Sequence, residues 1–280
     1  MPKVFWYYTL IIIGATLLIF TGIKKKKNIP EMFSFFVFVT GLSWGLELII
    51  MLILDAYEYK PGLFNNRVAE NIVGHLIANT ALWSSTAILI MYFQLSTPWL
   101  CLLSVSFMLI EELFIKVDAY DHNWWKTYMT GIGVFLFMWA MKKWYSKFYG
   151  NGYKWMRLIM CWVIAWVLIT TVTSTLILLG KLFFYVDWSE NIYRTSIEFS
   201  GFLYNVLMAS VATFFVSFLK KTYWCVVPFV LFLSGDILLH SLHILRLYDG
   251  WNVINLAILR ALSIGMFIIC EKYTLKQSVF

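Results

Sequence analysis

The apolar segment SGDILLHSLHILR (234–246) contains four ionisable side chains. Asp236, His240 and His243 are spaced i, i+4 and i+7, which would place them on one face of a helix. Arg246 follows near the end of the segment. A carboxylate and imidazoles on one face could relay protons, because histidine titrates near neutral pH, or could bind a metal. We expect no metal and no other cofactor, because three ligands on one helix rarely close a site and no HExxH motif is present. A functional polar cavity and structural hydrogen bonding between helices remain as two interpretations.

Polar residues also occur in three successive apolar segments earlier in the chain. Glu47 lies in the first, His75 and Asn79 lie at i and i+4 in the second, and Glu111 lies in the third. Ionisable groups inside a membrane are costly, so by default they face protein or water. We therefore predict two polar clusters at similar depth that share one cavity. The predicted cavity residues are Glu47, His75, Asn79, Glu111, Glu198, Asn205, Asp236 and His240.

Arg260 lies in another apolar segment, INLAILRALSIG. At 1.5 Å per residue, Asp236 and Arg260 would both lie roughly 14–17 Å below the turn that joins their segments. We predict a buried charge pair of Asp236 and Arg260, with His240 completing the network and Glu198 or Glu111 as the alternative partner of Arg260. This pairing would leave Glu111 as a free, titratable carboxylate.

These segments are elements of a membrane protein. Hydrophobic residues make up 61% of the 280 residues and charged residues only 13%, about half the usual share in a soluble domain. Many apolar runs are long enough to cross about 30 Å of hydrocarbon. Backbone groups in lipid must pair internally, which favours helices. The sequence predicts about nine transmembrane helices, at 5–23, 31–54, 68–94, 98–116, 125–145, 155–180, 195–218, 223–246 and 251–271.

Charge distribution predicts how the chain is oriented. The cluster KKKK (24–27) follows the first apolar run, and basic residues are more numerous on its side of the membrane. We predict a multi-pass protein of the bacterial plasma membrane with the N-terminus outside and the C-terminus in the cytoplasm. The net charge of +7 then reflects topology and contact with anionic lipid heads, so the expected partner is the bilayer and not nucleic acid.

An internal repeat divides the chain. Residue types recur at nearly the same spacing in two halves, first as Arg67, Asn79, Trp99 and Glu111, then as Arg194, Asn205, Trp224 and Asp236. We predict an all-α integral membrane fold with one N-terminal helix and two parallel four-helix repeats. The predicted parts are the N-terminal helix with the lysine cluster (1–30), repeat 1 (31–150) and repeat 2 (151–280).

The segment LIEELFIKVDAYDHNWWKTY (109–128) resembles the C-terminal signature of a poorly characterised family of small multi-span membrane proteins from spore-forming Firmicutes. YEYKPGLFNN (57–66) resembles the preceding loop of that family, and the resemblance covers about residues 31–146. It implies a membrane location and a link to sporulation, but no reaction or substrate. The matching outer-loop residues are Lys116, Tyr120, His122, Trp124 and Trp125.

Three functions are compatible with these patterns. The first is a small transporter or an ion or proton pathway, with an acidic cavity open to the outside and a small solute or proton as its ligand. The second is a non-catalytic membrane scaffold or sensor, and the third is an intramembrane lipid-modifying enzyme. We favour the first and expect no enzymatic activity. An aromatic belt explains Trp124 and Trp125, and an aromatic cage for a cation is the alternative.

Overall fold

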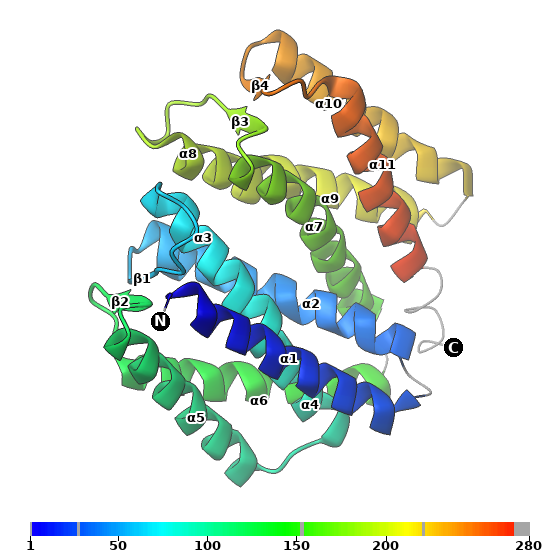
Figure 1. Ribbon diagram of the computed structural model, residues 1–280. Helices are drawn as coiled ribbons and strands as arrows, with labels where there is room; N and C mark the ends of the chain where they lie inside the picture. Colours follow the sequence, from blue (N-terminus) through cyan, green and yellow to red (C-terminus); the bar gives the residue numbers. More distant parts are fainter. Residues whose placement is uncertain (1, 27–28, 152–153, 220–221, 272–280) are drawn as a thin grey trace. The chain divides into compact units, whose positions relative to one another are not determined.

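The computed structural model describes residues 2–26, 29–151, 154–219 and 222–271. The chain divides into two compact units, Met1–Gly152 (unit 1) and Tyr153–Phe280 (unit 2). Both consist mainly of helices (Figure 1). The predicted all-α fold class is confirmed, and each unit is described by itself below.

Unit 1 consists of long helices with one short strand pair. Helix α1 precedes a series in which π-helical turns (η2 and η3) interrupt or extend two of the helices. The elements are α1 (Val4–Lys24), α2 (Ile29–Glu47), η2 (Leu48–Ile53), β1 (Tyr57–Tyr59), α3 (Arg67–Ala78), η3 (Asn79–Trp83), α4 (Ser84–Phe93), α5 (Thr97–Lys116), β2 (Tyr120–His122) and α6 (Thr127–Asn151).

Unit 2 repeats this order without a counterpart of α1. Two π-helical turns, η4 and η5, lie in its second long helix, and a 3-10 turn, η6, opens the next. The elements are α7 (Lys154–Leu178), β3 (Leu182–Phe184), α8 (Ile192–Glu198), η4 (Phe199–Tyr204), α9 (Asn205–Thr213), η5 (Phe214–Phe218), η6 (Thr222–Cys225), α10 (Val226–Ser241), β4 (Leu245–Leu247) and α11 (Val253–Ile269).

Seven helical segments are long and apolar enough to cross a membrane. Among the described residues these are α1, α2 with η2, α3 to α4, α5, α7, α8 to η5, and η6 with α10. Helix α6 has 25 residues but several lysines towards its end, and α11 has only 17 residues. The chain is therefore a multi-pass membrane protein, and the count of nine spans stays a prediction.

In the described ranges, each unit contains one antiparallel pair of three-residue strands. Tyr57 lies opposite His122 in the first pair, and Leu182 lies opposite Leu247 in the second. These strands are not predictable from the sequence, because three residues are too few to show an alternating pattern. The pairs join the ends of helices that are distant in the sequence, and thereby bring the loops after α2 and α5, or after α7 and α10, together.

A residue with positive φ precedes every strand by two positions. These residues are Asp55, Asp118, Gly180 and His243, with φ of 48°, 56°, 70° and 57°. In this conformation the chain leaves the helix, and the following amide bonds back to a carbonyl of the last turn, as Ala119 does to Phe114. Asp tolerates the left-handed region better than most residues with a Cβ.

Several equivalent positions in the two units are separated by 125 residues in the sequence. Leu182 follows Tyr57, and Leu245 follows Tyr120, by 125 residues. The same separation relates Asn66 and Asn191, whose side chains cap α3 and α8. It also relates Glu111 and Asp236. The shared order and spacing agree with an internal duplication, which stays a prediction.

Helix α1 packs closely on the other helices of unit 1. A Cβ added at Gly14 would lie 2.2 Å from the backbone oxygen of Ala81 in η3, so only glycine allows this approach. Tyr7 of α1 is fully buried, and its hydroxyl donates to the carbonyl of Ala119 at 2.7 Å. The predicted N-terminal part thus contacts both the helices and the strand region of unit 1.

Candidate functional site

A cavity of about 150 Å³ lies within unit 1, beside the β1–β2 pair. Its walls come from α1, α2, η2, α3, η3, α5 and α6 together with both strands. Most of the lining is apolar or aromatic. The polar and aromatic lining residues are Ser43, Glu47, Tyr57, Tyr59, Asn79, Trp83, Phe107, Glu111, Phe114, Tyr120, Trp125, Thr130 and Phe137.

Glu47, at the end of α2, is one of two carboxylates in this cavity and is 7% exposed. The hydroxyl of Tyr57 donates to its Oε2 at 2.7 Å, and the hydroxyl of Tyr59 lies 3.5 Å from its Oε1. His75 Nδ1 lies 3.9 Å from Oε2. Glu47 and His75 therefore lie close together, but His75, predicted as a cavity residue, is not among the residues that line the cavity. Strand β1 supplies two phenols that were not expected at the site.

Asn79 lies in the cavity wall at the first position of η3 and is fully buried. Its Nδ2 lies 3.1 Å from His75 Nδ1 and donates to the His75 carbonyl at 3.2 Å. Its Oδ1 has no hydrogen-bond partner among the described residues. A buried acceptor without a partner is rare, because it has lost its water without compensation.

Glu111, in the last third of α5, is the second carboxylate. His122 Nε2 lies 2.8 Å from its Oε1, and the hydroxyl of Thr130 donates to its Oε2. Trp125 Nε1 donates to Thr130 at 2.7 Å and holds that hydroxyl in place. The expectation that Glu111 is free is wrong, because the connection between α5 and α6, which contains β2, brings His122 back to α5.

The cavity offers mostly acceptors and ring faces to a ligand. Among the described residues, no Lys or Arg lines it. The basic residues of the neighbouring loops pair elsewhere, with Lys60 on Asp121 and Arg67 on Glu58. Burial raises the pKa of Tyr57 well above its usual value, so this phenol stays protonated and donates. Two carboxylates therefore share the cavity without a lysine or arginine counter-charge.

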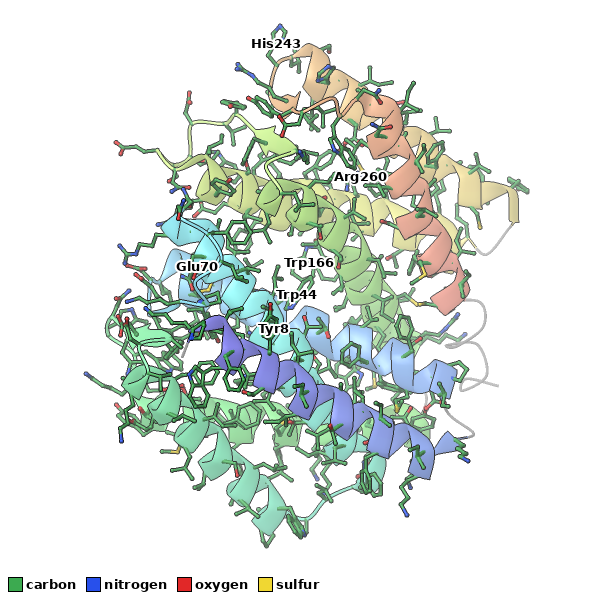
Figure 2. All side chains as sticks on the ribbon, in the orientation of Figure 1. Tyr8, Trp44, Glu70, Trp166, His243 and Arg260 are labelled. Atoms are coloured by element: carbon green, nitrogen blue, oxygen red, sulfur yellow. The ribbon has the colours of Figure 1, made fainter. Side chains whose placement is uncertain are left out.

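Unit 2 has a different arrangement at the equivalent place. Asp236 and Arg260 are both 1% exposed, and Arg260 Nε lies 3.3 Å from Asp236 Oδ2. Figure 2 labels Arg260 on α11. Its Nη1 donates to Thr173 at 2.8 Å, and the Tyr204 hydroxyl donates to Asp236 Oδ1 at 2.6 Å. The structure thus brings together the two residues that the sequence analysis paired.

The rings of Tyr204 and Phe232 complete this cluster. The guanidinium carbon of Arg260 lies 5.6 Å from the first ring centroid and 5.7 Å from the second. These distances are within the range of cation–π contacts. Asp236, Thr173, Tyr204 and Phe232 therefore form a protein-built site for one guanidinium group.

The predicted histidine stripe on α10 is wrong. Helix α10 ends at Ser241, and His243 has left-handed φ in the turn that follows (Figure 2). His240 is exposed and places Nδ1 3.1 Å from the Leu245 carbonyl, so it does not complete the Asp236 network. Arg246 lies on β4 with its guanidinium 4.2 Å from the Tyr185 ring centroid.

Glu198 and Asn205 have structural partners in unit 2. Glu198 accepts from Arg194 Nε at 2.8 Å, one helical turn away, and is not the partner of Arg260. Asn205 is fully buried and bonds Thr170 and Thr173, each at 3.3 Å. The prediction that both clusters share one cavity stays a prediction.

The loop residues that carry the family resemblance take different positions. Tyr120 and His122 lie on β2, and the Tyr120 ring is buried against Tyr57. Lys116 is exposed at the end of α5. Trp124 donates to the Leu54 carbonyl at 2.8 Å, whereas Trp125 lines the cavity. The predicted motif therefore contributes Tyr120, Trp125 and, through Glu111, His122 to the site.

Five residues of these clusters were not predicted from the sequence. They are Tyr57, Tyr59, Thr130, Thr173 and Tyr204. Thr173 belongs to the run TTVTST (170–175), whose hydroxyls usually bond their own backbone. Tyr204 precedes Asn205 directly, and this proximity to a predicted site residue was the available signal.

Comparisons of the chain with models of protein families, with curated proteins and with solved structures give no match. The resemblance of residues 31–146 to the Firmicutes family therefore stays a hypothesis. The described part of the chain contains no group of three or more His, Cys, Asp or Glu placed to hold a metal ion. The function is accordingly inferred from the geometry of the two clusters.

Proposed function

We propose that this membrane protein is a small transporter or ion pathway for cations, protons included, and that the cavity of unit 1 is its binding site. One observation carries the proposal. Glu47 and Glu111 line a single cavity of about 150 Å³ whose described lining contains no Lys or Arg. Carboxylates in a membrane interior are costly unless a cation or a proton compensates them.

The geometry of the polar groups supports a passage role over a purely structural one. In unit 2 the buried carboxylate binds a guanidinium of the protein itself. In unit 1 the carboxylates contact hydroxyls and an imidazole, from Tyr57, Thr130 and His122, and no lysine or arginine in the described lining balances their charge. The charge distribution of the chain predicts that the β1–β2 end faces outside, and the cavity would then open on that side.

Flux measurements on reconstituted protein test this function. Purified protein in liposomes should admit protons or small cations under an inside-negative potential, detected with a pH-sensitive dye and with radioactive sodium or methylammonium. Glu111→Gln keeps the shape of the side chain but removes its charge, and should reduce the flux about tenfold or more. Glu112→Gln is the matched control, because Glu112 is the exposed neighbour of Glu111 and does not line the cavity.

Two results would count against a transport function. One is wild-type flux no greater than that of empty liposomes for every ion tested. The other is a Glu111→Gln flux equal to wild type, which would place the pathway outside this cavity. If the protein shows neither flux nor ligand binding, the polar residues would only hold the helices together. The protein would then be the non-catalytic membrane scaffold or sensor that the sequence left as an alternative.

A further inference from the structure

We infer that the unit 1 cavity binds a small organic cation with N–H donors, of the guanidinium or primary ammonium class. The inference rests on the proposed function and names the chemistry of its ligand. It follows from a comparison of two sites in this chain. In unit 2 the side chain of Arg260 occupies the site beside Asp236, whereas in unit 1 a cavity lies beside Glu111.

The carboxylates and one ring match between the places. Glu111 and Asp236 are 125 residues apart and occupy equivalent helices, α5 and α10. Phe107 and Phe232 have the same separation. Phe107 lines the cavity in unit 1, whereas Phe232 lies under the Arg260 guanidinium in unit 2. The acceptor and the apolar floor of a guanidinium site are therefore present in both units.

The two groups that fill the site in unit 2 are missing in unit 1. When the first residues of α6 and α11 are aligned, Arg260 matches Val134. When Asn79 is aligned with Asn205, Tyr204 matches Ala78. Two large side chains are thus replaced by small apolar ones, and Ala78 lines the cavity that results. On this alignment the hollow of unit 1 would correspond to the space that Arg260 and Tyr204 occupy in unit 2, and Gly133, the neighbour of Val134, lines it.

The unpaired amide of Asn79 is an independent indication of a ligand. Asn79 lines the cavity, and its buried Oδ1 has no hydrogen-bond partner within the described part of the chain. An orphan acceptor beside two carboxylates calls for a donor with several N–H groups, which a guanidinium or an ammonium supplies. A bare metal ion uses oxygen ligands but gains less from ring faces, which here include Tyr57, Tyr120 and Trp125.

The dimensions of the cavity limit the ligand. A cavity of about 150 Å³ is of the size that takes up benzene in an engineered protein core. This admits a guanidinium or ammonium head with a short alkyl group. The ring faces exclude water and strengthen the attraction of the carboxylates for a cation.

Binding to the full-length protein in detergent tests the inference. The probes are methylguanidinium chloride, methylammonium chloride and N-methylurea, which has nearly the shape of methylguanidinium but no charge. Affinity is measured by calorimetry and by the change in tryptophan fluorescence, since Trp83 and Trp125 line the cavity. Methylguanidinium should bind saturably and at least about tenfold more tightly than N-methylurea.

Variants locate the binding site. Glu111→Gln should weaken methylguanidinium binding about tenfold or more, whereas Glu112→Gln should leave it within about twofold. If Glu111→Gln does not fold, Asn79→Leu removes the orphan acceptor and should weaken binding of both cations. Equal binding of methylguanidinium and N-methylurea, no binding of either cation, or equal effects of the two glutamate variants would overturn the inference.

This outcome is distinguishable from that of the flux experiment. Proton or sodium flux that depends on Glu111, without binding of either organic cation, would retain the proposed function and overturn the ligand class. Binding of methylguanidinium that depends on Glu111, without flux of any ion, would support the ligand class and overturn transport.

Discussion

Glu111 and Asp236 occupy equivalent positions of α5 and α10, but their carboxylates have different kinds of partner. Asp236 lies 3.3 Å from the buried guanidinium of Arg260. Glu111 contacts His122 and Thr130 and lines a cavity. One unit therefore supplies its own cation, and the other leaves room for one.

Breaking the buried pair in unit 2 should be strongly destabilising. Asp236→Ala and Arg260→Ala should each lower the free energy of unfolding by about 3–5 kcal/mol, because the remaining charge is stranded. The double variant should lose much less than the sum of the two. Denaturant unfolding in detergent, followed by tryptophan fluorescence, measures the cycle.

The control is the exposed pair of Lys181 and Asp249, at 2.8 Å. Its coupling energy should not exceed about 1 kcal/mol, because water screens both charges. Additive losses for Asp236 and Arg260 would mean that the pair has no energetic role.

Helix α6 is predicted to cross the membrane although its last turns are rich in lysine. Lys126 and Gly150, near its two ends, are both exposed. In a chain with its four cysteines replaced by alanine, Lys126→Cys should react with an impermeant maleimide added to intact cells. Gly150→Cys should react only after the cells are opened. Labelling of both positions from outside would mean that α6 does not span, and the reverse pattern would invert the predicted orientation.

The close approach of α1 to η3 should depend on a single glycine. The Cβ of Gly14→Ala would meet the Ala81 backbone, so α1 must shift, at a cost of about 1–3 kcal/mol of stability. Gly45→Ala is the matched control in α2, because nothing lies within 4 Å of its added Cβ. The control should be neutral or slightly stabilising, since alanine favours helix by about 1 kcal/mol. Equal melting temperatures of the two variants would contradict the packing described for α1.

The ion pair of Lys3 and Asp118 should make stability depend on pH. Lys3 lowers the pKa of Asp118, through a hydrogen bond and its charge. A lowered folded-state pKa contributes stability that is present above the unfolded value, about 3.9, and is lost as the pH falls through the folded value. Wild type should therefore melt at a higher temperature than Lys3→Met at pH 7, and the difference should shrink below about pH 4. A difference that stays constant from pH 7 to pH 3 would show that the charge of Asp118 is not involved.

The site differs from the one expected from the sequence at positions where a helix ends and the chain turns. His243 is i+7 from Asp236 in the sequence, yet it lies beyond α10, because the chain turns there into β4. The turn has a histidine with positive φ at a position where glycine is usual. The residue types therefore did not predict the end of the helix. His122 reaches Glu111 for a related reason, since β2 folds back beside β1.

The sequence by itself determined that the chain is a helical membrane protein and that Asp236 and Arg260 lie at matching depth. Hydropathy and run length suffice for this, because lipid forces backbone groups to pair within a helix. Only the tertiary structure decided that Arg260 faces Asp236 while Glu111 faces a cavity with Glu47 and Asn79. The direction in which a buried side chain points depends on the rotation of its helix about the helix axis. That rotation depends on how all neighbouring helices pack and on the extra residues of π-helical turns.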